Sequence, residues 1–389
     1  MKKNIAVFVS VVMLVSAAVS AEACTSFILK AKDGSPVYGR TLEWGVFDAK
    51  SEIVFVPRGL TFTSAAAEGV QGMTWVNKYG YVGINMLKKP YYLDGMNEEG
   101  LTVGSLYFPG FAKYQTLKDG EESCAINNID LTAYILGQFK TVQEIKAELF
   151  KIRVVYNEAM DKVFGVTTPL HYVVTDMAGN SIVIEYADSK LNIYDNTVGV
   201  MTNAPTYDWH ILSLRNYTQL SPYAPGPGDL KVEGINFTPF GGGSGMIGIP
   251  GDYSSSSRFI RAFFFTKTLL PMEDADAAIN QASRILDNFD CPKGFERTGT
   301  PEKYSLGYTQ WSTVGDIKNR RYYWWTEWNR QMRMVDLTKL DFASNTVKTF
   351  PLDAVRVESV DDRTGDFGSA IVSHPEESAI DSLSAGSVE

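Results

Sequence analysis

Short runs of alternating apolar and polar residues recur along most of the chain and predict β-strands. Residues 25–31 and 35–42 flank the turn dipeptide Asp33-Gly34, which predicts a β-hairpin. Further strands, most of them bounded by Gly, Asp or Asn, are predicted at residues 52–56, 74–84, 101–108, 170–175, 181–186, 191–195, 198–202, 310–314, 321–328 and 332–337. The pattern therefore predicts a framework rich in β-strands.

A second spacing, with apolar residues three or four positions apart, predicts four helices at residues 129–139, 142–150, 256–270 and 274–289. Helices thus interrupt the strands in pairs, and no internal repeat of the solenoid kind is present. The fold class predicted from these elements is α+β.

No linker divides the body of the chain, so we predict one domain from residue 24 to residue 360. Residues 222–245 are predicted to form a long surface excursion. From residue 361 the chain becomes polar and acidic with few aromatic residues, which is typical of an unpacked tail. Residues 361–389 are therefore predicted to be disordered.

The first 23 residues have the pattern of a cleaved signal peptide. Two lysines precede the apolar residues 5–15, and Ala21-Glu22-Ala23 offers the small-x-small pattern that signal peptidase accepts. Cleavage after Ala23, or after Ala21 with later trimming, leaves Cys24 as the new N-terminus. The apolar run is shorter than the roughly 20 residues that a membrane-spanning helix needs. We therefore expect a periplasmic or secreted protein without stable membrane insertion.

A cysteine directly after a cleavage site also occurs in lipid-modified proteins. An exported, lipid-tethered binding protein without chemistry is therefore an alternative, although the acidic Glu22 departs from the small, uncharged approach of that signal. The two hypotheses differ in whether the Cys24 thiol is free.

The composition excludes some partners. The net charge is −9 and basic clusters are lacking, so the chain has no electrostatic footprint for nucleic acid. There are three cysteines; if Cys24 is free, Cys124 and Cys291 either form a disulfide or remain as two buried thiols.

An N-terminal cysteine carries both a nucleophile and a base. Its α-amine has an ordinary pKa of roughly 7.7–8.0, so the amine can accept the thiol proton near neutral pH without a histidine. A papain-like Cys/His pair is the alternative, with His210 as the partner among three histidines.

Arg40 and Glu43 lie on the second arm of the predicted hairpin, which brings them toward Cys24. A guanidinium there favours the thiolate, and the Glu43 carboxylate would position the amine. The alternative is an exposed ion pair at a strand end, which is common and contributes little.

Five ordered motifs, found between Cys24 and about Leu340, resemble the choloylglycine hydrolase family, which contains bile salt hydrolases and penicillin V acylases. The motifs are Cys24-Thr25-Ser26-Phe27, Gly39-Arg40-Thr41-Leu42-Glu43-Trp44, Asp94-Gly95-Met96-Asn97-Glu98-Glu99-Gly100-Leu101, Val200-Met201-Thr202-Asn203-Ala204-Pro205 and Pro250-Gly251-Asp252-Tyr253-Ser254-Ser255-Ser256-Ser257-Arg258-Phe259. The resemblance implies an N-terminal-nucleophile hydrolase with a four-layer αββα sandwich. It also implies a homotetramer that acts on small-molecule linear amides, with no cofactor and no metal.

The resemblance also implies roles for single residues. Cys24 matches the nucleophile, with Arg40 and Glu43 beside it. Asn203 matches the asparagine whose side-chain N–H stabilises the oxyanion, and Arg258 matches an arginine that organises the site. Without the resemblance, the local pattern indicates that Asn203 is part of an Asn-Ala-Pro turn and that Arg258 is a residue in the first turn of a helix.

Two positions carry information about the reaction. Glu43 stands where the family usually has aspartate, so its carboxylate reaches one methylene further. Tyr107 stands where bile salt hydrolases typically have asparagine and penicillin V acylases tyrosine, and its backbone N–H would be the second oxyanion donor. Tyr107, Trp44 and Phe108 are predicted to line the acyl pocket; the alternative is that they are core residues.

Tyr107 favours hydrolysis of a penicillin V-like amide, with acyl-homoserine lactones as plausible natural substrates. Conjugated bile salts are the alternative substrate class. Both substrate hypotheses imply an acyl-enzyme intermediate on Cys24.

Overall fold

The computed structural model describes residues 24–226, 230–239 and 241–366. The predicted signal peptide lies outside the described residues, and so does the predicted tail apart from residues 361–366, which are exposed. Within these described ranges, no helix is both long and apolar enough to cross a membrane.

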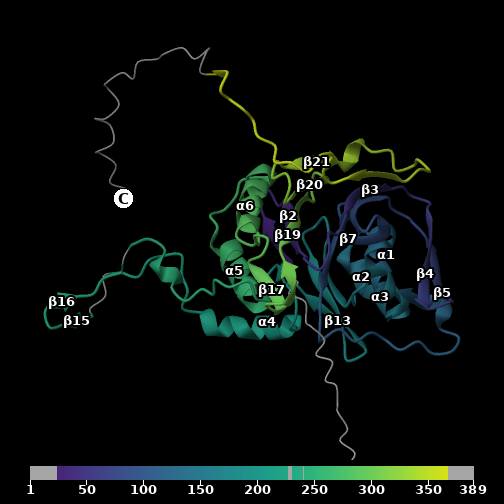
Figure 1. The fold of residues 1–389 in the computed structure, drawn as a ribbon, viewed down its shortest axis with the longest axis horizontal. Helices are drawn as coiled ribbons and strands as arrows, with labels where there is room; N and C mark the ends of the chain where they lie inside the picture. The colour runs from purple at the N-terminus through teal and green to yellow at the C-terminus, as the bar shows by residue number, and fades with distance from the viewer. Residues whose placement is uncertain (1–23, 227–229, 240, 367–389) are drawn as a thin grey trace, which may run out of the picture.

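Two large antiparallel sheets form the centre of the molecule (Figure 1). The first has the order β14-β1-β2-β19-β20-β21, with bounds Val200–Met201, Cys24–Lys30, Pro36–Glu43, Thr309–Asp316, Arg321–Thr326 and Arg333–Asp336. The second has the order β13-β12-β11-β8-β7-β6-β3-β22, with bounds Lys190–Asp195, Ser181–Ala187, Leu170–Thr175, Thr102–Tyr107, Lys89–Asn97, Tyr81–Met86, Glu52–Val56 and Lys348–Pro351. Their inner faces share the main hydrophobic core.

Helices cover the outer faces and complete the predicted four-layer αββα sandwich. Helices α5 (Ser255–Thr268) and α6 (Ala275–Asp287) pack on β1 and β2, and α1 (Leu131–Gln138) packs on β7 and β8 (Figure 1). The remaining helices are α2 (Val142–Glu148), α3 (Ala159–Phe164) and α4 (Tyr207–Ser213). The smaller strand pairs are β4 (Thr61–Ala67) with β5 (Val70–Val76), β9 (Ala125–Asn127) with β10 (Arg153–Val155), β15 (Lys231–Val232) with β16 (Ile235–Asn236), and β17 (Glu296–Thr300) with β18 (Lys303–Gly307).

Local chemistry explains why α6 forms where it does. The Asp274 carboxylate accepts a hydrogen bond from the Ala277 backbone N–H at 2.9 Å, which satisfies one of the free donors of the first turn. Apolar residues recur three or four positions apart and are buried against the first sheet. The prediction of this helix from its spacing is confirmed.

The register of the hairpin decides which side chains meet. Cys24 pairs with Leu42 and Ser26 with Arg40, so Cys24 and Arg40 share the face of the sheet. Glu43, one residue after Leu42, lies on the opposite face. The face with Cys24 and Arg40 points toward β7 and β8 of the second sheet. The face with Glu43 is covered by α5 and α6.

The predicted hairpin and most predicted strands are confirmed, but one prediction is wrong. Residues 74–84 are not one strand: they span the end of β5 and the start of β6, which belong to different sheets. Strand β7 was not predicted, because Pro90, Asp94 and Asn97 are typical of turns. Asp94 and Asn97 tolerate burial here because hydrogen bonds satisfy their side chains.

The three thiols are all free, so the disulfide between Cys124 and Cys291 is not formed. Cys291 is buried, as the alternative predicted, whereas Cys124 is partly exposed. The predicted surface excursion is confirmed: its described residues leave the body as an exposed arm that carries β15 and β16 (Figure 1).

Candidate active site

Cys24 begins β1 at the centre of the sandwich and is only 2 % exposed. Its Sγ lies 3.8 Å from Nη2 of Arg40. Burial raises the pKa of the Cys24 thiol, and the positive charge of Arg40 opposes this rise. The Cys24 thiol is therefore held in its neutral form. The Arg40 cation beside it stabilises the thiolate once a base removes the proton.

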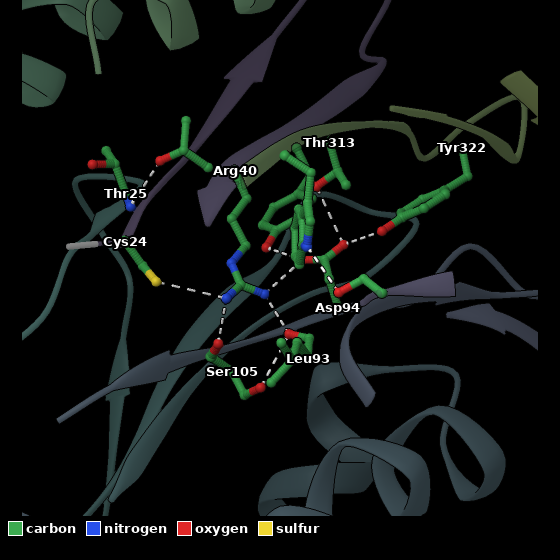
Figure 2. A network of polar contacts seen from close by, with 12 residues as sticks. Cys24, Thr25, Arg40, Leu93, Asp94, Ser105, Thr313 and Tyr322 are labelled. Carbon is green, nitrogen blue, oxygen red and sulfur yellow. Dashed lines mark hydrogen bonds and ion pairs between the residues drawn. The ribbon is translucent and has the colours of Figure 1, made fainter. Parts of the chain in front are cut away.

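Arg40 is held by acceptors from the second sheet (Figure 2). Its Nη2 donates to the Ser105 carbonyl at 2.5 Å, and its Nη1 donates to the Leu93 carbonyl. The guanidinium carbon also lies 5.1 Å from the centre of the Trp311 ring. Because the backbone carbonyls are part of the sheet, the guanidinium has little freedom to move away from Cys24.

Asp94 supplies the counter-charge of Arg40, at 3.3 Å from Nη1 (Figure 2). Its other contacts are hydroxyl donors: Tyr38 at 2.7 Å, Tyr322 at 2.5 Å and Thr313 at 3.3 Å. The sequence placed Asp94 in a motif without a role. The only sign in the sequence that Asp94 has a role is a carboxylate within an apolar run. The partners of Asp94 come from three other strands, which are distant in sequence.

Arg258 lies on α5, which packs on β1, and its side chain reaches the start of that strand. Its Nη1 donates to the Cys24 carbonyl and to Thr25 Oγ1 at 2.8 Å, and its Nη2 donates to Asn203 Oδ1 at 2.7 Å. It is 1 % exposed, so it is not an ordinary first-turn surface residue. Arg258 ties the backbone of the nucleophile to Asn203.

Asn203 joins three parts of the site. Its Oδ1 accepts from the Cys24 backbone nitrogen at 2.6 Å as well as from Arg258, and its Nδ2 donates to the Tyr107 carbonyl at 2.8 Å. A carboxamide nitrogen carries two hydrogens, and the Tyr107 carbonyl takes one of them. The structure brings Cys24, Arg40, Tyr107, Asn203 and Arg258 together.

Glu43 lies on the helix-facing side of the sheet. Its Oε1 accepts from Thr309 Oγ1 at 2.9 Å, and within the described residues its buried Oε2 has no hydrogen-bond partner. The alternative of an exposed ion pair with Arg40 is wrong, because both side chains are buried and point to opposite faces. Burial raises the pKa of Glu43 to about 8, against the attraction of Arg258.

We expect the free energy of unfolding to fall as pH rises from about 5 to 8. Folded Glu43 keeps its proton across this interval, whereas the unfolded chain releases it near 4.5, so the folded state binds more protons and loses stability as pH increases. Glu43→Gln keeps the size without the titration and should flatten this part of the profile. Urea unfolding of both proteins across the interval measures the difference; parallel profiles would contradict the buried neutral carboxyl.

A narrow apolar cavity opens at the Cys24 thiol. Trp44 and Tyr107 line it as predicted, with their rings edge to face and their centroids 5.6 Å apart. Residues that sequence reasoning missed complete the wall: Met86, Tyr91, Tyr92, Leu93, Phe164 and Leu170 among others. They come from separate strands and a helix, so no local pattern identified them.

Phe108 is not among the residues that line the cavity. It follows Tyr107 and turns to the other side, where its ring stacks on His171 at 4.2 Å between centroids. The prediction that it binds the acyl group is therefore corrected. Successive side chains of an extended chain point in opposite directions, so Tyr107 and Phe108 cannot both face the cavity.

The structure does not pair His210 with the thiol. Its Nε2 donates to the Asn203 carbonyl at 3.0 Å, and its ring stacks on Phe259. Burial lowers the pKa of His210 to about 4, so the ring is neutral at pH 7. The papain-like alternative therefore lacks the required contact between base and nucleophile.

Comparison with known proteins agrees with this geometry. A family model described as linear amide C–N hydrolases, choloylglycine hydrolase family, matches residues 24–350. A bile salt hydrolase/transferase of Clostridium perfringens is 31 % identical over 329 residues, which cover 84 % of this chain and 96 % of that protein.

Solved structures give the same result at the level of the fold. A mutant of the conjugated bile acid hydrolase from Clostridium perfringens superposes with a TM-score of 0.74 at 29 % identity, covering 87 % of this chain and 99 % of that one. The penicillin V acylase from Agrobacterium tumefaciens superposes with a TM-score of 0.68 at 26 % identity, covering 86 % and 93 %. The chain belongs to the choloylglycine hydrolase family of linear amide C–N hydrolases.

Proposed function

We propose that this enzyme hydrolyses linear amides with a flat aromatic or linear aliphatic acyl group, in the manner of a penicillin V acylase, through an acyl-enzyme on Cys24. The observation that carries the proposal is that Cys24 lines a narrow apolar cavity, with its thiol 3.8 Å from Arg40 and its backbone nitrogen 2.6 Å from Asn203 Oδ1. The acyl group would fill the cavity, and the amine part of the substrate would remain toward solvent.

The chemistry follows from the atoms around Cys24. The α-amine freed by removal of residue 23 accepts the thiol proton, and the thiolate attacks the amide carbon to form a C–S bond. The second Nδ2 hydrogen of Asn203 stabilises the negative oxygen, a role that typically contributes about 3–4 kcal/mol. The ammonium then protonates the departing amine as the C–N bond breaks, and water releases the acid by the same steps.

The lining of the cavity supports the choice of acyl group. Trp44, Tyr91, Tyr92 and Phe164 contribute aromatic rings to it, with those of Tyr91 and Phe164 edge to face at 5.4 Å, and the lining offers few polar atoms. A phenoxyacetyl group or an alkyl chain, including that of an acyl-homoserine lactone, is narrower than the four fused rings of a bile salt and needs fewer polar partners.

A second candidate, hydrolysis of conjugated bile salts, has its own support. Relatives from Clostridium perfringens, Lactiplantibacillus plantarum and Bifidobacterium longum, at 30–34 % identity, are named bile salt hydrolase/transferase. A steroid would have to bind among the same aromatic side chains that line the cavity.

Substrate profiling tests the proposal. We expect kcat/KM for penicillin V or a medium-chain acyl-homoserine lactone to exceed that for glycine- and taurine-conjugated bile salts. Trp44→Leu, which removes an aromatic wall, should lower kcat/KM for the preferred substrate, whereas Trp328→Leu, at an exposed position after β20, should not. Higher kcat/KM for bile salts would favour the second candidate, and hydrolysis of none of these amides would contradict both.

We also propose that the active form is exported and begins at Cys24. Support comes from the leader pattern and from the buried Cys24 nitrogen, which already lies 2.6 Å from Asn203 Oδ1. The intact mass of active, exported protein should equal that of a chain starting at Cys24. A diacylglyceryl mass on Cys24 would instead support the tethered binding protein.

The homotetramer implied by the family resemblance is proposed as well. The arm carries exposed apolar side chains, among them Leu230, Ile235 and Phe237, and its strands β15 and β16 lie at a distance from the body (Figure 1). Exposed apolar groups of this kind gain most by packing on another copy. Sedimentation equilibrium of the mature chain distinguishes a tetramer from a monomer.

A further inference from the structure

Two buried histidines hold the backbone on which Asn203 stands. His171 Nε2 lies 2.9 Å from the Thr202 carbonyl, and His210 Nε2 lies 3.0 Å from the carbonyl of Asn203 itself. A carbonyl oxygen only accepts, so in both rings Nε2 carries the hydrogen and donates it. Two consecutive peptide groups are thus fixed from the side chains of two other elements, β11 and α4.

Each histidine ring is fixed by a phenylalanine next to a site residue. Phe108, which follows Tyr107, stacks on His171 with ring centroids 4.2 Å apart and an interplanar angle of 8°. Phe259, which follows Arg258, stacks on His210 at 4.6 Å and 12°. The position of Asn203 is therefore coupled through packed rings to Tyr107 and Arg258, two of the three residues that its carboxamide contacts.

His171 is further held by Glu185 of β12. The distance from His171 Nδ1 to Glu185 Oε1 is 3.2 Å, and the same oxygen accepts from the Tyr207 backbone N–H at 3.0 Å. Because Nε2 already carries a hydrogen toward Thr202, a proton must also lie between Nδ1 and the carboxyl oxygen for a hydrogen bond to form there. Both side chains are almost fully buried, so water does not supply an alternative partner.

We propose that His171 and Glu185 form a positioning pair for the oxyanion donor Asn203. The pair contacts no reacting atom; it fixes the Thr202 carbonyl and thereby the direction of the Asn203 carboxamide between Cys24 and Tyr107. This inference rests on the proposed oxyanion role of Asn203. A small misplacement of such a donor lowers the rate of the chemical step more than it lowers substrate binding.

Two amide variants of His171 distinguish a role in positioning Asn203 from a role in packing alone. The amide nitrogen of asparagine takes the place of Nδ1, whereas that of glutamine takes the place of Nε2. His171→Asn should lower kcat by up to about 10²-fold with KM nearly unchanged, and His171→Gln should recover much of the loss because it can still donate to Thr202. Penicillin V, or the preferred amide from the substrate profile, is the probe, and the acyl-enzyme burst counts active sites so that kcat refers to folded enzyme.

Glu185 provides the second pair of variants. Glu185→Gln can keep its amide oxygen in the place of Oε1, where it still accepts from the Tyr207 N–H, so kcat should fall by less than in Glu185→Leu. Glu185→Leu satisfies neither group and should lower kcat as His171→Asn does. Thr175→Val is the matched control, because it removes one partly buried hydrogen bond, to Ser181, from the other end of the same strand.

The outcomes distinguish this inference from the function on which it rests. Equal kcat values in His171→Asn and His171→Gln, or a loss in His171→Asn no larger than in Thr175→Val, would overturn the positioning pair. If the histidine variants do not fold, a kcat of Glu185→Leu equal to that of Glu185→Gln overturns it instead. Wild-type kcat in Asn203→Ala would remove the oxyanion role itself, whereas a slow Asn203→Ala beside a fast His171→Asn contradicts only the positioning pair.

Discussion

Cys24→Ser should lower kcat by at least about 10³-fold while substrate still binds. A serine hydroxyl is much less acidic than a thiol, so neither the α-amine nor Arg40 can generate enough of the anion. The cavity is otherwise unchanged, because oxygen for sulfur alters one atom of its lining. Stopped-flow mixing with penicillin V measures the burst of the first product and the later steady state, and both should be lost.

The matched control is Cys124→Ser. Cys124 is partly exposed, and its Sγ donates to the Glu121 carbonyl, so the same substitution there should leave kcat unchanged. Retention of the burst by Cys24→Ser would remove the covalent mechanism. Equal losses in both variants would indicate damage to folding rather than to the nucleophile.

Asp94→Asn should lower the free energy of unfolding by about 3–5 kcal/mol, because it leaves the buried Arg40 guanidinium without a counter-charge. The new amide hydrogens would also face donors, namely the hydroxyls of Tyr38 and Tyr322 (Figure 2). In the folded fraction, the Leu93 and Ser105 carbonyls still hold Arg40 beside Cys24, so kcat should fall by much less than in Cys24→Ser. Urea unfolding gives the stability, and burst-normalised kinetics give kcat.

A surface ion pair provides the comparison for Asp94. Glu273 lies 2.5 Å from Lys32, and both side chains are more than half exposed. Glu273→Gln replaces a carboxylate by an amide, as Asp94→Asn does, and so removes one charge. It should lower the free energy of unfolding by less than about 1 kcal/mol. An unfolding midpoint of Asp94→Asn equal to that of Glu273→Gln would show that Arg40 does not depend on its buried partner.

Local patterns predicted most elements and part of the site. The alternation on either side of Asp33-Gly34 predicted the hairpin that begins at Cys24, and the helical spacing at residues 256–270 and 274–289 predicted the helices that cover it. The roles expected of Asn203 and Arg258 came from the resemblance to a family, since each residue alone also fits a turn or a helix start.

What the tertiary structure decided concerns partners that are distant in sequence. Arg40 and Glu43 are three residues apart, yet the pleat sends them to opposite faces, one to Asp94 and the other to Thr309. The same alternation turns Tyr107 into the cavity and Phe108 onto His171. Alternation along one strand divides its side chains between two faces. Which face contacts the second sheet depends on how the layers pack, and so does which buried charge has a counter-charge there.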